Sequence, residues 1–147
     1  MLQRLVSLLS GEGDPAPEER QAADRVAIAA LLVEAARADG EYLDAERDMI
    51  DQVLGERFGL SPDEATALRA EGEEAQAEAV DLVRFTRVIK DAIPIEDRIE
   101  VIEAVWRVVY ADNHRDADEG NLIRRLAGLL YVPDRDAGLA RQRVTGS

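Results

Sequence analysis

The stretch Ala38-Asp39-Gly40-Glu41-Tyr42-Leu43-Asp44-Ala45-Glu46 decides the fold, because it follows the most apolar run in the chain and then returns in altered form. The second copy runs from Ala111 to Glu119 and reads Ala-Asp-Asn-His-Arg-Asp-Ala-Asp-Glu. The spacing between the copies is constant, and the same spacing aligns Met49 with Leu122 and Ile50 with Ile123. The repetition predicts a helical module with two pseudo-symmetric helix-loop-helix halves, each hinged on an acidic loop.

The composition favours helices throughout the chain. At 147 residues the chain fits one domain with a real core, and Ala, Leu, Val and Ile supply nearly all of its apolar residues. Aromatic residues make up only 4%, and 5 prolines are present, which favours helix over strand. Apolar residues nowhere alternate with a period of two, so no strand is predicted. We therefore expect an all-α fold, a single compact domain over residues 1–147 with about seven helices.

The formal net charge of −13 bears on partners rather than on the fold. An acidic surface repels phosphate backbones, so a nucleic-acid partner is not expected, whereas cations and basic protein surfaces are attracted. The chain has no cysteine, which excludes disulfides, thiolate metal sites and cysteine nucleophiles. A cytoplasmic location is compatible with this composition.

The two ends of the chain carry their own signals. The N-terminal segment, Met1 to Ser10, is apolar on one side and too short to span a membrane. We expect it to form a short first helix that packs on the domain, and the alternative is an interfacial or partner-binding helix. Residues 11–17 form a linker by their glycine and proline content. Residues 141–147 are expected to be a flexible tail.

The most apolar run, Val26 to Ala36, contains Glu34 as its only polar residue. A helix that is apolar nearly all round is buried on most sides, so a central helix is predicted from near Pro17 to Ala38. In the repeat, Arg107 takes the place of Glu34, which allows an ion pair between the two halves.

The other helices are bounded by recognisable end signals. Ser61-Pro62-Asp63-Glu64 reads as a capping box, in which the side chains of Ser61 and Glu64 each bond the other residue's amide. Gly72 lies inside the helix that follows and weakens the case for one continuous helix. The remaining helices are predicted from about Asp44 to Phe58, after Asp81, from Ile95 to Tyr110, from Asp116 to Leu130, and after Pro133.

The chain carries none of the common enzyme motifs. It has no His-Glu-x-x-His metal helix, no Gly-x-Ser-x-Gly elbow and no phosphate-binding loop. His114 is the only histidine and lies in a loop. Trp106 and Tyr110 extend an apolar helical stripe, so we assign them to the core rather than to a ligand site.

The acidic loops are the candidate functional sites. Carboxylate and amide oxygens are the ligands that hard divalent cations such as calcium, magnesium and manganese prefer. A single short loop supplies too few ligands, whereas two loops that face each other would supply enough. The candidate metal ligands are Asp39, Asp44 and Glu46 in the first loop and Asp112, Asp116 and Glu119 in the second.

The same loops also have a structural interpretation. Gly40 and Asn113 accept the left-handed backbone conformation in which helices often end. Asp39 is placed to accept loop amides, Asp44 to cap the next helix, and Glu46 to interact with the dipole of that helix. We give this interpretation more weight, because acidic caps are common and closed oxygen sites are rare, and the cation site stays open beside it.

Three segments resemble the TerB-like family of tellurite resistance proteins: Ala30 to Ile50, Val83 to Asp91, and Val105 to Asp134. The resemblance implies a compact all-α fold with pseudo-twofold helix pairs. It also implies a cytoplasmic, stress-associated protein that binds metal. The second loop departs from the family pattern, because Asn113 replaces the usual glycine and His114 the usual acid. The family's acids carry over to Asp39, Glu46, Asp112 and Glu119.

We therefore expect a non-enzymatic helical module that binds a protein partner and is tuned by a divalent cation. The alternative is a metal-dependent enzyme, such as a hydrolase, that uses the same acidic loops. Catalytic carboxylates should converge on a concave pocket, whereas interaction loops should turn their carboxylates to backbone amides. Because tellurite is an anion, an acidic chain would act on it indirectly. Membrane contact is not expected, and the sequence leaves the oligomeric state open.

Overall fold

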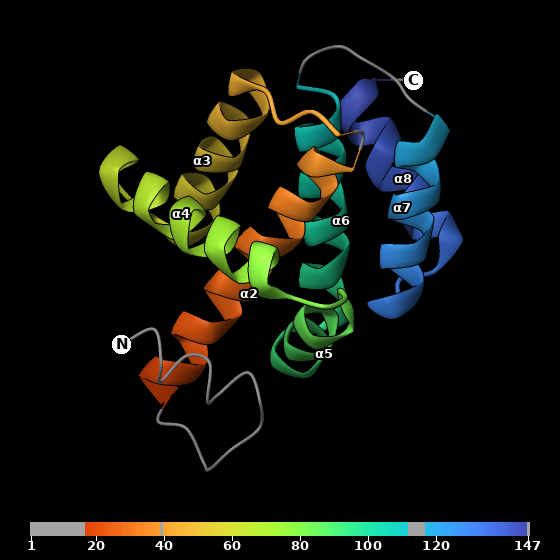
Figure 1. The fold of residues 1–147 in the computed structure, drawn as a ribbon. Coiled ribbons are helices and arrows are strands. Elements are labelled where there is room, and N and C mark those ends of the chain that lie inside the picture. Colours follow the sequence, from red (N-terminus) through yellow and green to blue (C-terminus); the bar gives the residue numbers. More distant parts are fainter. Residues whose placement is uncertain (1–16, 39, 112–116, 147) are drawn as a thin grey trace.

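The structure is a computed structural model, and it describes residues 17–38, 40–111 and 117–146. Seven helices and no strand lie within these ranges (Figure 1), which confirms the predicted all-α class. The predicted helix over Met1–Ser10 and its linker lie outside the described residues, apart from Pro17. The helices are α2 (Pro17–Arg37), α3 (Asp44–Phe58), α4 (Pro62–Glu78), α5 (Val83–Ala92), α6 (Ile95–Val109), α7 (Ala117–Leu129) and α8 (Asp134–Thr145).

Helix α2 is the centre of the fold, as its apolar sequence predicts. Every residue from Val26 to Ala36 is buried except Glu34, which is half-buried. Leu31 and Leu32 have no exposed surface. Helices α3, α4, α5, α6 and α7 all pack against α2, and Figure 1 shows α4 crossing it. A helix with neighbours on nearly every side must be apolar on nearly every side, which explains its sequence.

Helix α4 is continuous through Gly72, and the reason for this glycine lies on α2. A Cβ atom added to Gly72 would lie 2.6 Å from the Cβ of Ala29 and 2.8 Å from its carbonyl carbon. The two helix backbones therefore approach too closely for any side chain at this position. Gly72 is buried at the crossing and does not break the helix, so the weakness expected from the sequence is absent.

Helices α3 and α7 end in the same kind of turn. Gly59 has a φ of 64°, and the amide of Leu60 donates to the carbonyl of Gly55 at 3.0 Å. At the end of α7, Tyr131 has a φ of 57°, and the amide of Val132 donates to the carbonyl of Ala127 at 2.8 Å. Both turns satisfy carbonyls that a helix end leaves unpaired. Only the first uses a glycine, so Tyr131 adopts a conformation that is unfavourable for a large side chain.

Two features of the C-terminal half correct the sequence-based expectations. The predicted tail at 141–147 is wrong for all but its end, because α8 continues to Thr145 and Gly146 caps it with a φ of 74°. Val144 is partly buried against the core, which holds the last turn in place. The ion pair expected between Glu34 and Arg107 is also wrong. Arg107 bonds Glu56, and Glu34 accepts from Gln76 instead.

The repeated positions show similar burial. Ile50 and Ile123 are buried, and Met49 and Leu122 are both half-buried. Trp106 is 8% exposed and stacks on Tyr110, with ring centroids 5.6 Å apart, so both belong to the core as expected. The pseudo-symmetry of the two halves as three-dimensional units stays a prediction. No helix in the described ranges is long and apolar enough to cross a membrane.

Candidate functional site

The first acidic loop joins α2 to α3, and its turn is built as the sequence predicts. Gly40 has a φ of 86°, and its amide donates to the carbonyl of Arg37 at 3.0 Å. This conformation strongly favours glycine, which explains the residue. Glu41 is exposed on the loop. Asp39, the first candidate ligand, lies outside the described residues.

Asp44 is not the cap of α3, which corrects the structural role predicted for it. The N-cap is Leu43, with extended backbone angles of φ −86° and ψ 157°, and Asp44 is the first helical residue. The Asp44 carboxylate is 93% exposed and lies 2.8 Å from Arg47 Nη1. This carboxylate therefore points to solvent at the first turn, where it still suits the helix dipole.

Glu46 performs the capping instead. Its side chain is 2% exposed, and Oε1 accepts the Leu43 amide at 2.9 Å. Because leucine has no side-chain acceptor, the Glu46 amide donates to the Leu43 carbonyl at 3.0 Å, and only half of a capping box forms. The acid that the sequence offers as a cation ligand is thus used to start α3.

The second acidic loop lies mostly outside the described residues. The structure does not describe Asp112, Asn113 or Asp116. Of Glu119 it describes only the backbone, which lies in the first turn of α7. In the part of the chain that is described, no three histidine, aspartate or glutamate side chains are grouped closely enough to hold a metal ion. Whether the two loops face each other stays a prediction.

Tyr42 anchors the first loop to α4, a role that no pattern in the sequence predicts. The guanidinium of Arg47 lies 4.4 Å from the Tyr42 ring centroid and that of Arg37 lies 4.9 Å away. Such contacts stabilise an exposed aromatic by about 0.5–1 kcal/mol each. The Tyr42 hydroxyl is buried beside Glu73 and Arg69 of α4, without a well-formed hydrogen bond. The loop is therefore held by its aromatic residue rather than by its acids.

This setting raises the pKa of Tyr42 to about 12, chiefly through burial and then through Glu73, against a smaller lowering by Arg69. Because the folded state favours the neutral phenol, Tyr42 contributes stability below its ordinary pKa of 10.0. That contribution is lost as the pH rises from there towards about 12.

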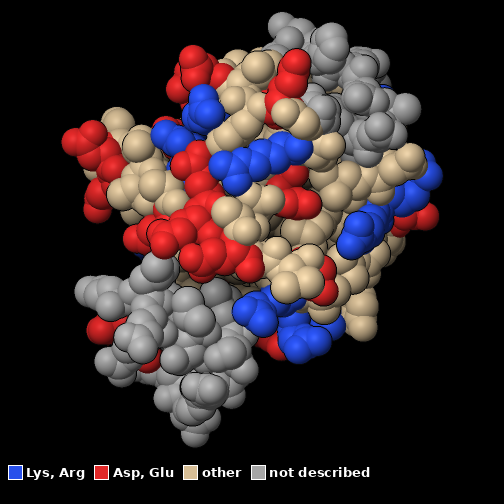
Figure 2. All heavy atoms as spheres, viewed as in Figure 1, with Lys and Arg blue, Asp and Glu red and all other residues tan. Residues whose placement is uncertain are grey.

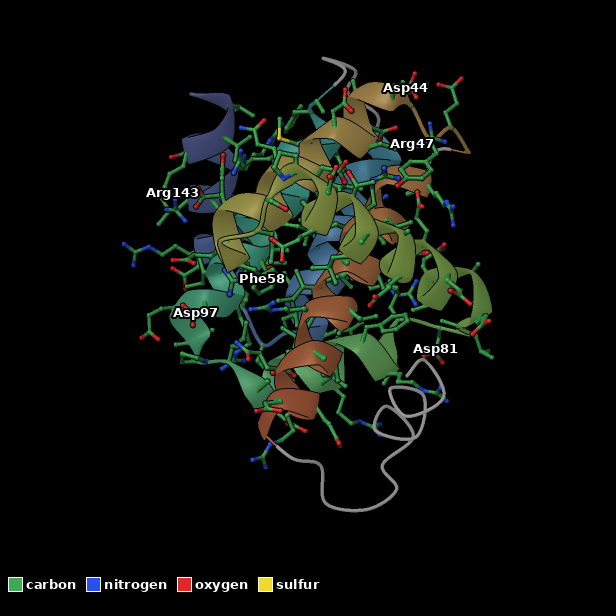
Figure 3. All side chains as sticks on the ribbon, turned by 90° about the vertical axis from the view of Figure 1, so that its left-hand side faces the viewer. Asp44, Arg47, Phe58, Asp81, Asp97 and Arg143 are labelled. Carbon is green, nitrogen blue, oxygen red and sulfur yellow. The ribbon has the colours of Figure 1, made fainter. Side chains whose placement is uncertain are left out.

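A groove between α3 and α6, called the α3–α6 groove below, has a volume of about 620 Å³. Val53, Phe58 and Ala104 form its apolar floor. Four acids and two arginines complete the lining: Glu56, Asp97, Glu100, Glu103, Arg57 and Arg107. In Figure 3, Phe58, Asp97 and Arg143 lie towards one side of the view, and Asp44 and Arg47 of the first loop lie towards the other.

Ion pairs join the two walls of the α3–α6 groove in both directions. Arg57 of α3 lies 3.1 Å from Glu100 of α6. Arg107 of α6 lies 2.9 Å from Glu56 of α3, and hydrogen bonds from Arg107 and Gln52 lower the pKa of Glu56. Asp97 forms no ion pair with any described residue, so the lining carries an excess of negative charge.

The sequence held only a partial signal for this groove. Glu100, Glu103 and Arg107 form the polar stripe of an otherwise apolar helix. The stripe indicates one wall, but the residues of α3 that face it are far away in the sequence. Arg143 of α8 lies 2.8 Å from Glu103, although the sequence predicts that it belongs to a flexible tail.

Comparison with known families matches residues 25–142 to the model described as tellurite resistance protein TerB. The matched region covers both acidic loops and most of α2, and it continues into α8. Comparison with curated proteins found no match, and comparison with solved structures found none either.

Proposed function

The chain belongs to the TerB family of tellurite resistance proteins, and from this membership we propose a non-enzymatic, stress-associated interaction module that binds a basic segment of a partner protein. The partner binds in the α3–α6 groove through arginine or lysine side chains and an apolar contact. The observation that carries this proposal is the excess of carboxylates in a groove with an apolar floor. Effects on tellurite would then be indirect, because the chain carries a net charge of −13 and repels anions.

The groove offers a basic segment two kinds of contact. Asp97 and Glu100 lie on the α6 side and are accessible, and Glu100 is already shared with Arg57. Asp97 has no arginine partner among the described residues, so it can bind an incoming lysine or arginine directly. Glu100 can bind one by exchanging its bond to Arg57. Phe58 and Val53 offer the apolar contact between them. Charge complementarity of this kind favours specificity and rapid association more than tight binding.

The non-enzymatic character is supported by how the first loop uses its acids. Glu46 is buried as a cap, and Asp44 turns to Arg47 and solvent. Neither carboxylate lines the α3–α6 groove. A hydrolase that used this loop would need them to converge on a concave site with room for substrate.

We expect a fluorescent peptide of lysine, leucine and alanine to bind the full chain, and its glutamate counterpart not to bind. Neutralising Asp97 and Glu100 (D97N/E100Q) should weaken binding of the lysine peptide by about 3- to 10-fold, since exposed charge pairs contribute about 0.2–1 kcal/mol each. The measurement is fluorescence anisotropy at about 0.15 M ionic strength, where the Debye length is about 8 Å and distant charges are screened.

The matched control for this test is D91N/E96Q, which removes two exposed acids of α5 and α6 outside the groove. It should leave peptide affinity within about twofold, because neither carboxylate lines the groove and neither can therefore pair directly with a bound peptide. Equal weakening by both double variants would show unspecific attraction to the acidic surface and would reject the groove as the binding site.

Binding of calcium, magnesium or manganese to the paired acidic loops is the regulatory part of the proposal. Asp39, Asp112 and Asp116 are its central residues, because Glu46 is used as a cap. Calorimetric titration should give weak, roughly millimolar binding and a rise in melting temperature, as expected for a few carboxylates in open loops. D39N/D112N should abolish both effects, whereas the exposed control D63N should retain them. No heat and no thermal shift at millimolar metal would end this part of the proposal.

A further inference from the structure

A second groove lies between the start of α2 and α4, and it is called the α2–α4 groove below. Its volume is about 340 Å³, and its floor is apolar, with Ala22 from α2, Ala67 and Leu68 from α4, and Leu60 from the preceding turn. A floor of this kind resembles the surface against which an amphipathic helix packs. It lies at the exposed end of α2, where the chain enters the described structure.

The rim of the α2–α4 groove is acidic. Glu18, Glu64 and Glu71 line it, and neither Glu18 nor Glu71 forms an ion pair with another described residue. Arg25 is the only basic residue of the lining, and its guanidinium lies over the Phe58 ring, 5.0 Å from the centroid. Figure 2 shows acidic side chains gathered along α4 on this side of the molecule. The groove therefore fits a segment that is apolar on one side and basic.

The N-terminal segment, Met1–Ser10, has this chemistry. Its polar residues Gln3, Ser7 and Ser10 recur at helical spacing and leave the other side apolar. Arg4 lies beside the polar face, and the segment contains no acid. Ten residues are too few for a stable isolated helix in water, so such a segment needs a surface on which to fold. The apolar residues that would face the groove floor are Leu2, Leu5, Val6 and Leu9.

The connection between the segment and the groove is short. Residues 11–16 separate Ser10 from Pro17, and a chain of that length reaches at most about 20 Å. The groove begins at Glu18, next to the first residue of α2. A short tether of this kind gives a local concentration of about millimolar, so even weak contacts are occupied.

We propose that Met1–Ser10 docks as an amphipathic helix in the α2–α4 groove of its own chain, with Arg4 against the glutamates of the rim. The family match begins at residue 25, so both the segment and the first turns of α2 lie outside it. The docking is therefore a feature of this chain rather than of the matched domain.

Spin labelling of the full chain tests the proposal. Because the chain has no native cysteine, the label attaches only to an introduced one. A nitroxide on Q3C should broaden the amide resonances of residues 18–25 and 64–71 and leave those of α8 sharp. Adding L5E and L9E to the labelled chain should restore the sharp resonances. Broadening spread evenly over the molecule, or centred on another surface, would overturn the proposal.

Two further experiments distinguish docking within one chain from docking on a second copy and from membrane binding. Mixing nitroxide-labelled chain with isotope-labelled, cysteine-free chain should give no broadening, and broadening there would assign the groove to a second copy. If broadening of the groove amides appears only with anionic lipid vesicles, the segment is a membrane element and the proposal fails.

The charge contribution is tested separately. E18Q/E71Q should reduce the broadening several-fold at low salt, because both glutamates line the groove. The matched control E74Q/E78Q removes two exposed acids of the same helix outside the groove and should leave the broadening unchanged. Equal loss in both variants would contradict the assignment of Arg4 to this rim. Circular dichroism of each variant confirms that the helices are retained.

Discussion

Replacing Gly72 with alanine is expected to destabilise the protein by about 1–3 kcal/mol, although alanine is the better helix former. The added Cβ would lie 2.6 Å from the Ala29 Cβ and 3.0 Å from the Ala30 backbone nitrogen. A backbone cannot move aside as the end of a flexible side chain can, so α2 and α4 must separate. Because α2 contacts five other helices, this shift disturbs the packing of the whole core. Urea unfolding followed by circular dichroism measures the loss.

The controls for this prediction are other helical glycines. Gly128 and Gly138 have no atom within 4 Å of an added Cβ, so G128A and G138A should stabilise the protein by up to about 1 kcal/mol. G72A and A29G together should cost less than the sum of the two single losses, since A29G removes the Cβ contact but leaves the backbone contacts. If G72A is as stable as G128A, the close crossing of α2 and α4 is wrong.

Gly72 also shows which parts of the fold the sequence reveals. Local signals sufficed for the helix class and for most helix ends, because caps such as Ser61 with Glu64 act within one turn. The purpose of Gly72 depends on Ala29, which is far away in the chain and close only in space. Sequence alone therefore shows the cost of a helical glycine but not the packing that requires it.

The first acidic loop illustrates a finer limit. Its sequence places Asp44 and Glu46 within one turn of the start of α3, but a shift of one residue decides which of them caps the helix. Leucine at the N-cap is unusual, so the pattern favoured Asp44, and the structure uses Glu46. The two arginines that flank Tyr42 come from two different helices, α2 and α3, and no local rule pairs them.

Replacing Arg69 with methionine is expected to cost about 2–3 kcal/mol, somewhat below the usual loss for removing one partner of a fully buried pair. Arg69 is 15% exposed, and its Nε lies 2.6 Å from Asp51 of α3. Its Nη1 lies 3.0 Å from Glu73. Burial alone would lower the pKa of Arg69, but the bond to Asp51 and the nearby carboxylates outweigh burial and raise it. Without the guanidinium, two partly buried carboxylates lose the cation that they share.

A double-mutant cycle separates this pair from general damage. R69M and D51N together should cost less than the sum of the single losses, because D51N removes a charge that R69M leaves unpaired. A strictly additive cycle would show that Arg69 acts through packing rather than through charge. The Thr66 hydroxyl also donates to Asp51 at 2.9 Å. D51N keeps a side-chain oxygen that accepts this bond, so the single substitution should cost little stability.

The same variant tests whether the first loop depends on α4. Arg69 lowers the pKa of Tyr42, while burial and Glu73 raise it to about 12. In R69M the phenol should therefore titrate at a still higher pH, as absorbance at the phenolate wavelength measures, provided that the loop stays in place. If the loop is released instead, Tyr42 becomes exposed and its pKa falls towards the ordinary 10.0. An upward shift would mean that Tyr42 holds the loop through Arg37 and Arg47 alone. A downward shift would mean that α4 holds it, and the predicted cation ligands next to Tyr42 would then depend on Arg69 for their position.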